Sequence, residues 1–198
     1  MRRKRTTDER HAWNGRAGFR YTAAMNPTRI YDYLALSRER VMDAVRRLTP
    51  AAYRREFAFG LKTMGSTLTH IMIAEWYYIE RLEGRTVPPY AEWPFQYERP
   101  PAFEVIDQTW REQAKRVRAA VAAEGDWNRT ISYLTFPDDR GRRYYITATA
   151  GDFFTQLALH EVHHRAQVLA MLRELGDAAT PVQDIDFNDM MYDRRELA

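Results

Sequence analysis

Apolar residues recur every three or four positions along four long stretches of this sequence. Such spacing places the apolar side chains on one face of a helix, so the pattern predicts four amphipathic helices. Asn26, a good N-cap, and Pro27, at the first helical position, mark the start of the first helix. Thr49 and Pro50 are expected to end it. The predicted helices cover about residues 26–49, 62–83, 102–124 and 151–175.

The segments between the predicted helices differ in composition. Residues 85–101 hold five prolines, which predicts a long crossing loop. Residues 130–148 are rich in β-branched and aromatic residues on both sides of the turn sequence 137–141, which predicts a β-hairpin. We therefore expect an all-α fold: a four-helix bundle with a crossover connection and a small β-hairpin between the third and fourth helices.

The length of 198 residues and the apolar content of 45% suit one domain with a packed core. We expect residues 25–176 to form the bundle, residues 1–24 to be a disordered basic extension and residues 177–198 to be a loosely attached C-terminal tail. No stretch approaches the roughly 18 apolar residues of a membrane helix, and no apolar run follows the basic N-terminus as in a secretory signal. The expected location is therefore the cytoplasm, without a membrane partner.

The sequence pI of about 9.2 has its origin in the N-terminal extension. Residues 1–24 carry seven Arg and Lys against two acidic residues, whereas the rest of the chain carries 23 basic and 25 acidic residues. A basic tail can touch nucleic acid or anionic surfaces, but short charged termini are usually just solvated. The charge distribution therefore argues against a nucleic-acid partner.

The chain contains no cysteine. Disulfides, thiolate metal ligands and a cysteine nucleophile are thereby excluded. A metal ion would have to be held by histidine and carboxylate side chains, and thiol chemistry would need a thiol from outside the protein.

Two of the five histidines continue the apolar stripe of the fourth predicted helix. His160 and His164 lie one turn apart on this face, and two imidazoles at this spacing can reach one metal ion. A single buried histidine usually bonds an ordinary partner, but two on one seam repel each other when charged, and a shared ion satisfies both. His70, in an apolar run at mid-helix, is the third candidate. We therefore predict that His70, His160 and His164 hold one divalent ion and leave its fourth position open, as in catalytic sites.

The other two histidines are expected to be solvated. His11 belongs to the basic extension, and His163 lies about 100° around the helix from His164 and beside Arg165. Neither is a predicted ligand.

The string His160-Glu161-Val162-His163-His164 also satisfies the H-E-x-x-H pattern of zinc peptidases, in which the glutamate is the general base. Such a peptidase needs a third ligand downstream, and no second G-x-x-H element follows. The downstream carboxylates that could serve instead are Asp184, Asp186 and Asp189. We keep the peptidase as a minor alternative, expect Glu161 to be a partner of a ligand or a surface carboxylate, and assign no catalytic residue.

Several strings together resemble the DinB-like (DinB/YfiT) family of metal-dependent bundle proteins. The more specific string is H-E-V-H-H-R-A-Q at residues 160–167, followed by L-R-E-L-G at 172–176. The second helix contributes S-T-L-T-H-I at residues 66–71, with E-W at 75–76 and L-E-G at 82–84. The resemblance covers about residues 25–176, and Ala166 stands where the family often has glycine.

The resemblance implies a four-helix bundle of unusual connectivity, frequent dimerisation and a divalent ion held by three histidines, at the positions of His70, His160 and His164. Characterised relatives include transferases and isomerases that use low-molecular-weight thiols. We therefore expect a homodimeric enzyme that depends on one zinc, nickel or iron ion and acts on a small molecule, as a transferase or hydrolase with an external thiol or metal-bound water. The alternative is a metal-dependent binding or stress-response protein without turnover.

Overall fold

The computed structural model describes residues 26–138, 140–182 and 185–193. The expectations for residues 1–24, including His11, and for Asp184 as a ligand lie outside the described residues.

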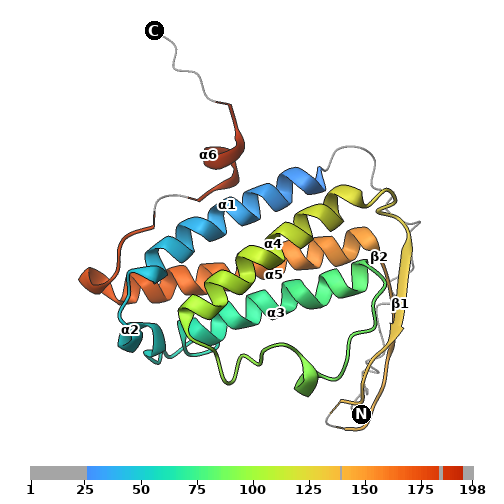
Figure 1. The fold of residues 1–198 in the computed structure, drawn as a ribbon, viewed down its shortest axis with the longest axis horizontal. Helices are drawn as coiled ribbons and strands as arrows, with labels where there is room; N and C mark the ends of the chain where they lie inside the picture. Colours follow the sequence, from blue (N-terminus) through green and yellow to red (C-terminus); the bar gives the residue numbers. More distant parts are fainter. Residues whose placement is uncertain (1–25, 139, 183–184, 194–198) are drawn as a thin grey trace, which may run out of the picture.

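The described part of the chain is mostly helical, with one small antiparallel sheet (Figure 1). The α-helices are α1 (Pro27–Arg46), α2 (Pro50–Arg54), α3 (Met64–Leu82), α4 (Phe103–Ala123), α5 (Ala150–Glu174) and α6 (Phe187–Met191). The strands are β1 (Thr130–Leu134) and β2 (Tyr145–Thr149), and short 3-10 helices cover Tyr90–Glu92 and Gly176–Ala178. The helical class and the four long predicted helices are confirmed, with bounds that differ by a few residues.

The four long helices lie side by side (Figure 1). α3 packs against α5 and α4, and α1 packs against α4 and α5, so each long helix contacts two others. The connection between α3 and α4 is long, as its prolines predicted. No helix in the described ranges is both long enough and apolar enough to cross a lipid bilayer.

Side-chain caps explain where the helices begin. The Asn26 side chain accepts a hydrogen bond from the Arg29 backbone N–H at 3.0 Å, and Thr63 does the same for the Ser66 N–H at 3.0 Å. Thr49, predicted to end the first helix, instead caps α2, which the sequence did not predict. A Thr-Pro pair can end the preceding helix and can also begin the next one. Here α1 ends at Arg46, shortly before the pair, and the pair begins α2.

The predicted β-hairpin is confirmed between α4 and α5. β1 and β2 pair antiparallel, with Thr130 opposite Thr149 and Leu134 opposite Tyr145. Ile131 is buried and belongs to the apolar core, which anchors the hairpin to the helices. β2 leads directly into α5, because Thr149 is both the last strand residue and the N-cap of the helix.

The segment after α5 contacts the helical body. Ala179, Val182 and Ile185 pack against the core, and α6 lies against α1, where the Phe187 ring meets the Tyr33 ring edge-on at 5.1 Å. The sequence offered only weak apolar periodicity here, because most of these contacts come from irregular backbone. The expectation of a loosely attached tail did not foresee them.

Candidate metal centre

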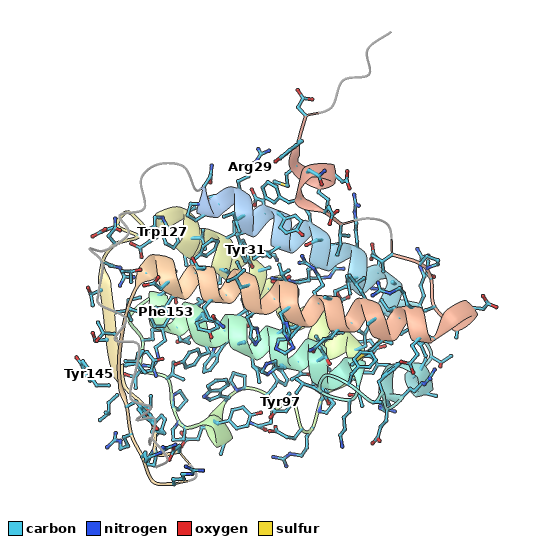
Figure 2. All side chains as sticks on the ribbon, turned by 180° about the vertical axis from the view of Figure 1, so that it is seen from behind. Arg29, Tyr31, Tyr97, Trp127, Tyr145 and Phe153 are labelled. Carbon is cyan, nitrogen blue, oxygen red and sulfur yellow. The ribbon has the colours of Figure 1, made fainter. Side chains whose placement is uncertain are left out.

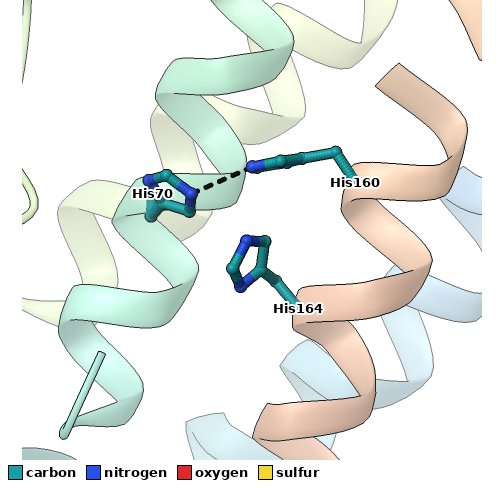
Figure 3. A group of neighbouring side chains, drawn as sticks. All are labelled: His70, His160 and His164. Carbon is teal, nitrogen blue, oxygen red and sulfur yellow. Dashed lines mark hydrogen bonds between the residues drawn. The ribbon is translucent and has the colours of Figure 1, made fainter. Parts of the chain in front are cut away.

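Three histidine side chains from two helices converge on one another (Figure 3). His70 extends from α3, and His160 and His164 extend from α5 toward it. One ring nitrogen of each lies within 4.8 Å of the other two, and the Nε2 atoms of His160 and His70 are 2.9 Å apart. Imidazole nitrogens about 2.0–2.1 Å from one tetrahedral ion lie roughly 3.4 Å from one another. The group is therefore compatible with one shared ion after small side-chain movements.

Burial keeps these imidazoles uncharged near neutral pH. Burial, followed by the charge of His164, lowers the pKa of His70 to about 4. Burial, followed by the neighbouring histidine charges, lowers the pKa of His160 to about 3. Burial also lowers the pKa of His164, although its hydrogen bond to Gln167 opposes the shift. A metal ligand must be neutral imidazole, so this environment favours coordination.

Gln167 orients the third ligand. The Oε1 atom of Gln167 lies 2.9 Å from Nδ1 of His164, and an amide oxygen can only accept, so His164 donates from Nδ1 and keeps the Nε2 lone pair free. The Gln167 amide nitrogen lies 3.3 Å from Nε2 of His163, which is exposed as predicted. Sequence reasoning did not assign this role to Gln167.

A cavity of about 570 Å³ lies at the N-terminal end of α3, and none of the three histidines lines it directly. Three of its lining residues neighbour His70 or the Gln167 side chain. Ser66 precedes His70 by one helical turn, the Tyr97 ring meets the His70 ring edge-on at 5.2 Å, and Gly60 lies against the Gln167 side chain. Tyr97 comes from the connection between α3 and α4 and is labelled in Figure 2. The remaining lining residues are Tyr53, Arg54, Glu56, Leu61, Lys62, Thr63, Gly65, Glu98 and Pro100.

Glu161 is not placed as the general base of a peptidase would be. It is buried, and its two carboxylate oxygens accept hydrogen bonds from Arg38 at 3.1 and 2.6 Å and from Arg165 at 3.2 Å. Asp186 and Asp189 do not join the histidine group, which has no carboxylate member within the described residues. The H-E-x-x-H match therefore combines two candidate ligand positions with a carboxylate that belongs to a buried ion-pair network.

The buried ion pairs were missed by sequence reasoning. Arg165 was treated as a sign of a solvated rim, but it is buried, and so are Arg38, Glu75 and Glu161. A signal was present: Arg38 follows Leu34 by four residues in the apolar stripe of α1, and Glu75 follows an apolar run on α3. Charged residues of opposite sign on apolar faces of different helices indicate buried pairs, although not which residues pair.

Comparison with known proteins adds one match. The model of the DinB family matches residues 22–195, which is most of the chain and includes all three histidines. No curated protein matches the chain.

Proposed function

Because the chain belongs to the DinB family, we propose that it is a metal-dependent enzyme in which His70, His160 and His164 hold one zinc, nickel or iron ion. We assign the fold as a four-helix bundle with a crossover connection, built from α1, α3, α4 and α5. The observation that carries the proposal is the convergence of three neutral imidazoles from two helices.

The donor set fits a divalent ion of the catalytic kind. Three imidazoles occupy three positions and leave at least one for a ligand from outside, and such a set accepts several first-row metals. When bound, the ion supplies Lewis acidity that activates a thiol or a water molecule at neutral pH. The chain's own residues hold the site: Gln167 orients His164, and the packing of α3 against α5 brings His70 to the other two.

The surroundings favour an external thiol as the nucleophile. The chain has no cysteine of its own, and among the described residues the group of close ligand atoms contains no carboxylate, although the charge of Glu98 acts on His70. In the proposed transfer, the thiol sulfur forms a bond to an electrophilic carbon of the second substrate. The leaving group departs with its electron pair, and the thiol proton passes to solvent.

The cavity suits small polar substrates. Its volume lies in the usual range for ligand sites, about 300–1,000 Å³. Arg54, Lys62 and Glu56 bring charges to its lining, while Tyr53 and Leu61 supply apolar surface. We also propose a homodimer, on the basis of the family resemblance alone.

Cobalt substitution tests this function. Co(II) in place of the native ion reports thiol binding through a sulfur-to-cobalt charge-transfer band in the near ultraviolet. We expect 2-mercaptoethanol to produce this band in the wild-type protein and in His163→Ala, whose imidazole is exposed, but not in His160→Ala. We further expect metal-dependent loss of the thiol when a chromogenic electrophile is added.

Two outcomes would contradict the enzyme. Cobalt binding without a thiol band would remove the thiol as ligand. A thiol band without metal-dependent consumption of thiol, over a panel of electrophiles, would favour the alternative of a metal-dependent binding protein without turnover.

A further inference from the structure

We infer that Arg38 is a positioning residue of the metal centre, because its guanidinium joins the two ligand-bearing helices directly behind the histidines and sets their separation. The inference rests on the proposed metal site but not on the proposed reaction.

The guanidinium of Arg38 forms a bridge between α3 and α5. Its Nη2 atom donates to Oε1 of Glu75, on α3, at 2.6 Å and to Oε2 of Glu161, on α5, at 2.6 Å. Its Nε atom donates to Oε1 of Glu161 at 3.1 Å, so the contact with α5 is bidentate. Two carboxylates held by one planar group have a fixed distance and orientation, which a flexible ammonium group would not impose.

Each carboxylate is held by further donors. Glu75 accepts from Tyr31 at 3.0 Å, from the Trp110 indole N–H at 2.8 Å and from the Gln113 amide at 2.6 Å. Tyr31 lies on α1, and the other two donors lie on α4. On the other side, Arg165 donates to Glu161 at 3.2 Å and to the Tyr33 hydroxyl at 3.1 Å. The network thus connects all four long helices and balances two positive charges with two negative ones.

The network lies close to the candidate ligands along both helices. Glu161 directly follows His160 on α5, and Glu75 lies five residues after His70 on α3. The α5 carboxylate therefore shares a turn with an imidazole, whereas the α3 carboxylate lies between one and two turns beyond His70, and both lie on a different face from the imidazoles. The apolar core has two parts, one toward α2 and one toward the hairpin, and the carboxylates and Arg38 fall between them along their helices.

Arg38 is buried, although an open groove of about 370 Å³ reaches its side chain beside Trp110. A residual cavity of about 10 Å³, bordered by Arg38, Trp110 and Glu161, is at the lower limit for one water molecule. The Trp110 ring also lies over the guanidinium, 4.3 Å from its carbon. Burial by itself would lower the pKa of Arg38, but the charges of Glu161 and Glu75 outweigh it and raise the pKa. The guanidinium therefore remains a cation.

Stability alone does not require this arrangement, since well-packed apolar side chains often replace buried ion pairs without loss. A bridge between two ligand helices does have a specific consequence for the ligands. A change in the separation of α3 and α5 moves His70 relative to His160 and His164. Partners that hydrogen-bond a ligand directly typically change metal affinity about 10–100-fold, and Arg38, which acts through Glu75 and Glu161, is expected at the lower end of this range.

The test compares Arg38→Lys, which keeps the charge but loses the planar fork, with two control variants. Arg46→Lys changes an arginine on the same helix that pairs with Asp107 at the surface. Val117→Ala lowers stability through the core near the hairpin and removes no hydrogen-bonding group of the network. For each folded protein, the Co(II) dissociation constant and the visible d–d spectrum are measured by titration.

We expect about 10-fold weaker Co(II) binding and a changed d–d spectrum in Arg38→Lys, with both controls like the wild type. A general loss of stability would instead lower the melting temperature of Val117→Ala and Arg38→Lys alike and leave the spectrum of the folded protein unchanged. If Arg38→Lys does not fold, Glu75→Gln, which weakens the bridge at α3 only, is expected to show a smaller change of the same kind.

The two possible failures are distinguishable. Wild-type affinity and an unchanged spectrum in folded Arg38→Lys, or in Glu75→Gln if it replaces that variant, would overturn the positioning role alone. Absence of Co(II) binding by the wild-type protein would overturn the proposed metal site and the positioning role together.

Discussion

Burial has opposite consequences for two groups of side chains that lie within one helical turn of each other. It keeps His70 and His160 neutral, because their nearest ionisable neighbours are other imidazoles that repel a second charge. Arg38 remains charged, because two carboxylates touch it. The charge state of each group is therefore set by its charged partners rather than by how deeply it is buried. The neutral imidazoles keep their lone pairs for a metal ion, close to the charged Arg38 bridge.

The lowered histidine pKa values predict how stability of the metal-free protein depends on pH. In the unfolded chain these imidazoles titrate near pH 6.5, whereas in the folded protein His70 and His160 titrate at about 4 and 3. As the pH falls below 6.5 the unfolded state therefore binds protons first, and the free energy of unfolding decreases until the folded pKa is reached.

Urea unfolding of the chelator-treated protein between pH 7.5 and pH 4.5 measures this loss. We expect a shallower decrease for His160→Gln than for the wild type, and a wild-type decrease for the exposed control His163→Gln. Identical pH profiles for the wild type and His160→Gln would contradict the assignment of a buried neutral imidazole.

Residue spacing alone was sufficient to select the three histidines, because two of them are separated by one helical turn and the third interrupts an apolar run. The partners of Arg38 were not accessible in the same way. Glu75 and Glu161 are 37 and 123 residues away from it, and no local rule joins residues so far apart. Sequence periodicity shows which face of a helix is buried but not which residue of another helix it meets.

At the scale of the elements, the N-terminus of α5 is fixed by a capping box. The Thr149 hydroxyl accepts from the Asp152 N–H at 3.0 Å, and the Asp152 carboxylate accepts from the Thr149 N–H at 2.9 Å. We expect Thr149→Ala to lower the free energy of unfolding by about 1 kcal/mol in urea denaturation. Thr149→Ser, which keeps the hydroxyl, should stay within a few tenths of a kcal/mol, and an equal loss in both variants would exclude the capping role.

The turn before α3 touches the ligand system through Gly60. Gly60 has a φ of 59°, and an added Cβ would lie 3.0 Å from the Gln167 oxygen that orients His164. Gly60→Ala is therefore expected to destabilise the fold by about 1–2 kcal/mol through its backbone and also to weaken metal affinity.

Gly84→Ala is the matched control, because its φ is 73° but nothing lies within 4 Å of its added Cβ. Its stability loss should be similar, whereas metal affinity, measured by Co(II) titration, should not change. Equal metal affinity in the two variants would show that Gly60 does not act on the site through Gln167.

The long elements were predictable because their apolar periodicity is strong, and the hairpin because its turn sequence separates two β-rich segments. The short helix α2 was not predictable, because Thr49 and Pro50 signal both the end of one helix and the start of another. The packing of Ala179, Val182 and Ile185 was also not predictable, because irregular backbone gives its buried side chains no period.

At the scale of the whole molecule, the proposed ion would link α3 to α5 and should stabilise the native state. An ion at about 100 times its dissociation constant adds about 2.7 kcal/mol, which for a chain of this size raises the melting temperature by roughly 5–10 °C. Calorimetry with and without Zn(II) or Ni(II) measures the shift, and a chelator should reverse it. The same shift in His70→Ala would mean that the metal binds elsewhere.

Whether the three histidines hold the ion is tested most directly by elemental analysis of the natively purified protein beside two single variants. We expect about one divalent ion per chain in the wild type and in His163→Ala, and almost none in His160→Ala. Equal metal content in His160→Ala and the wild type would contradict the proposed centre.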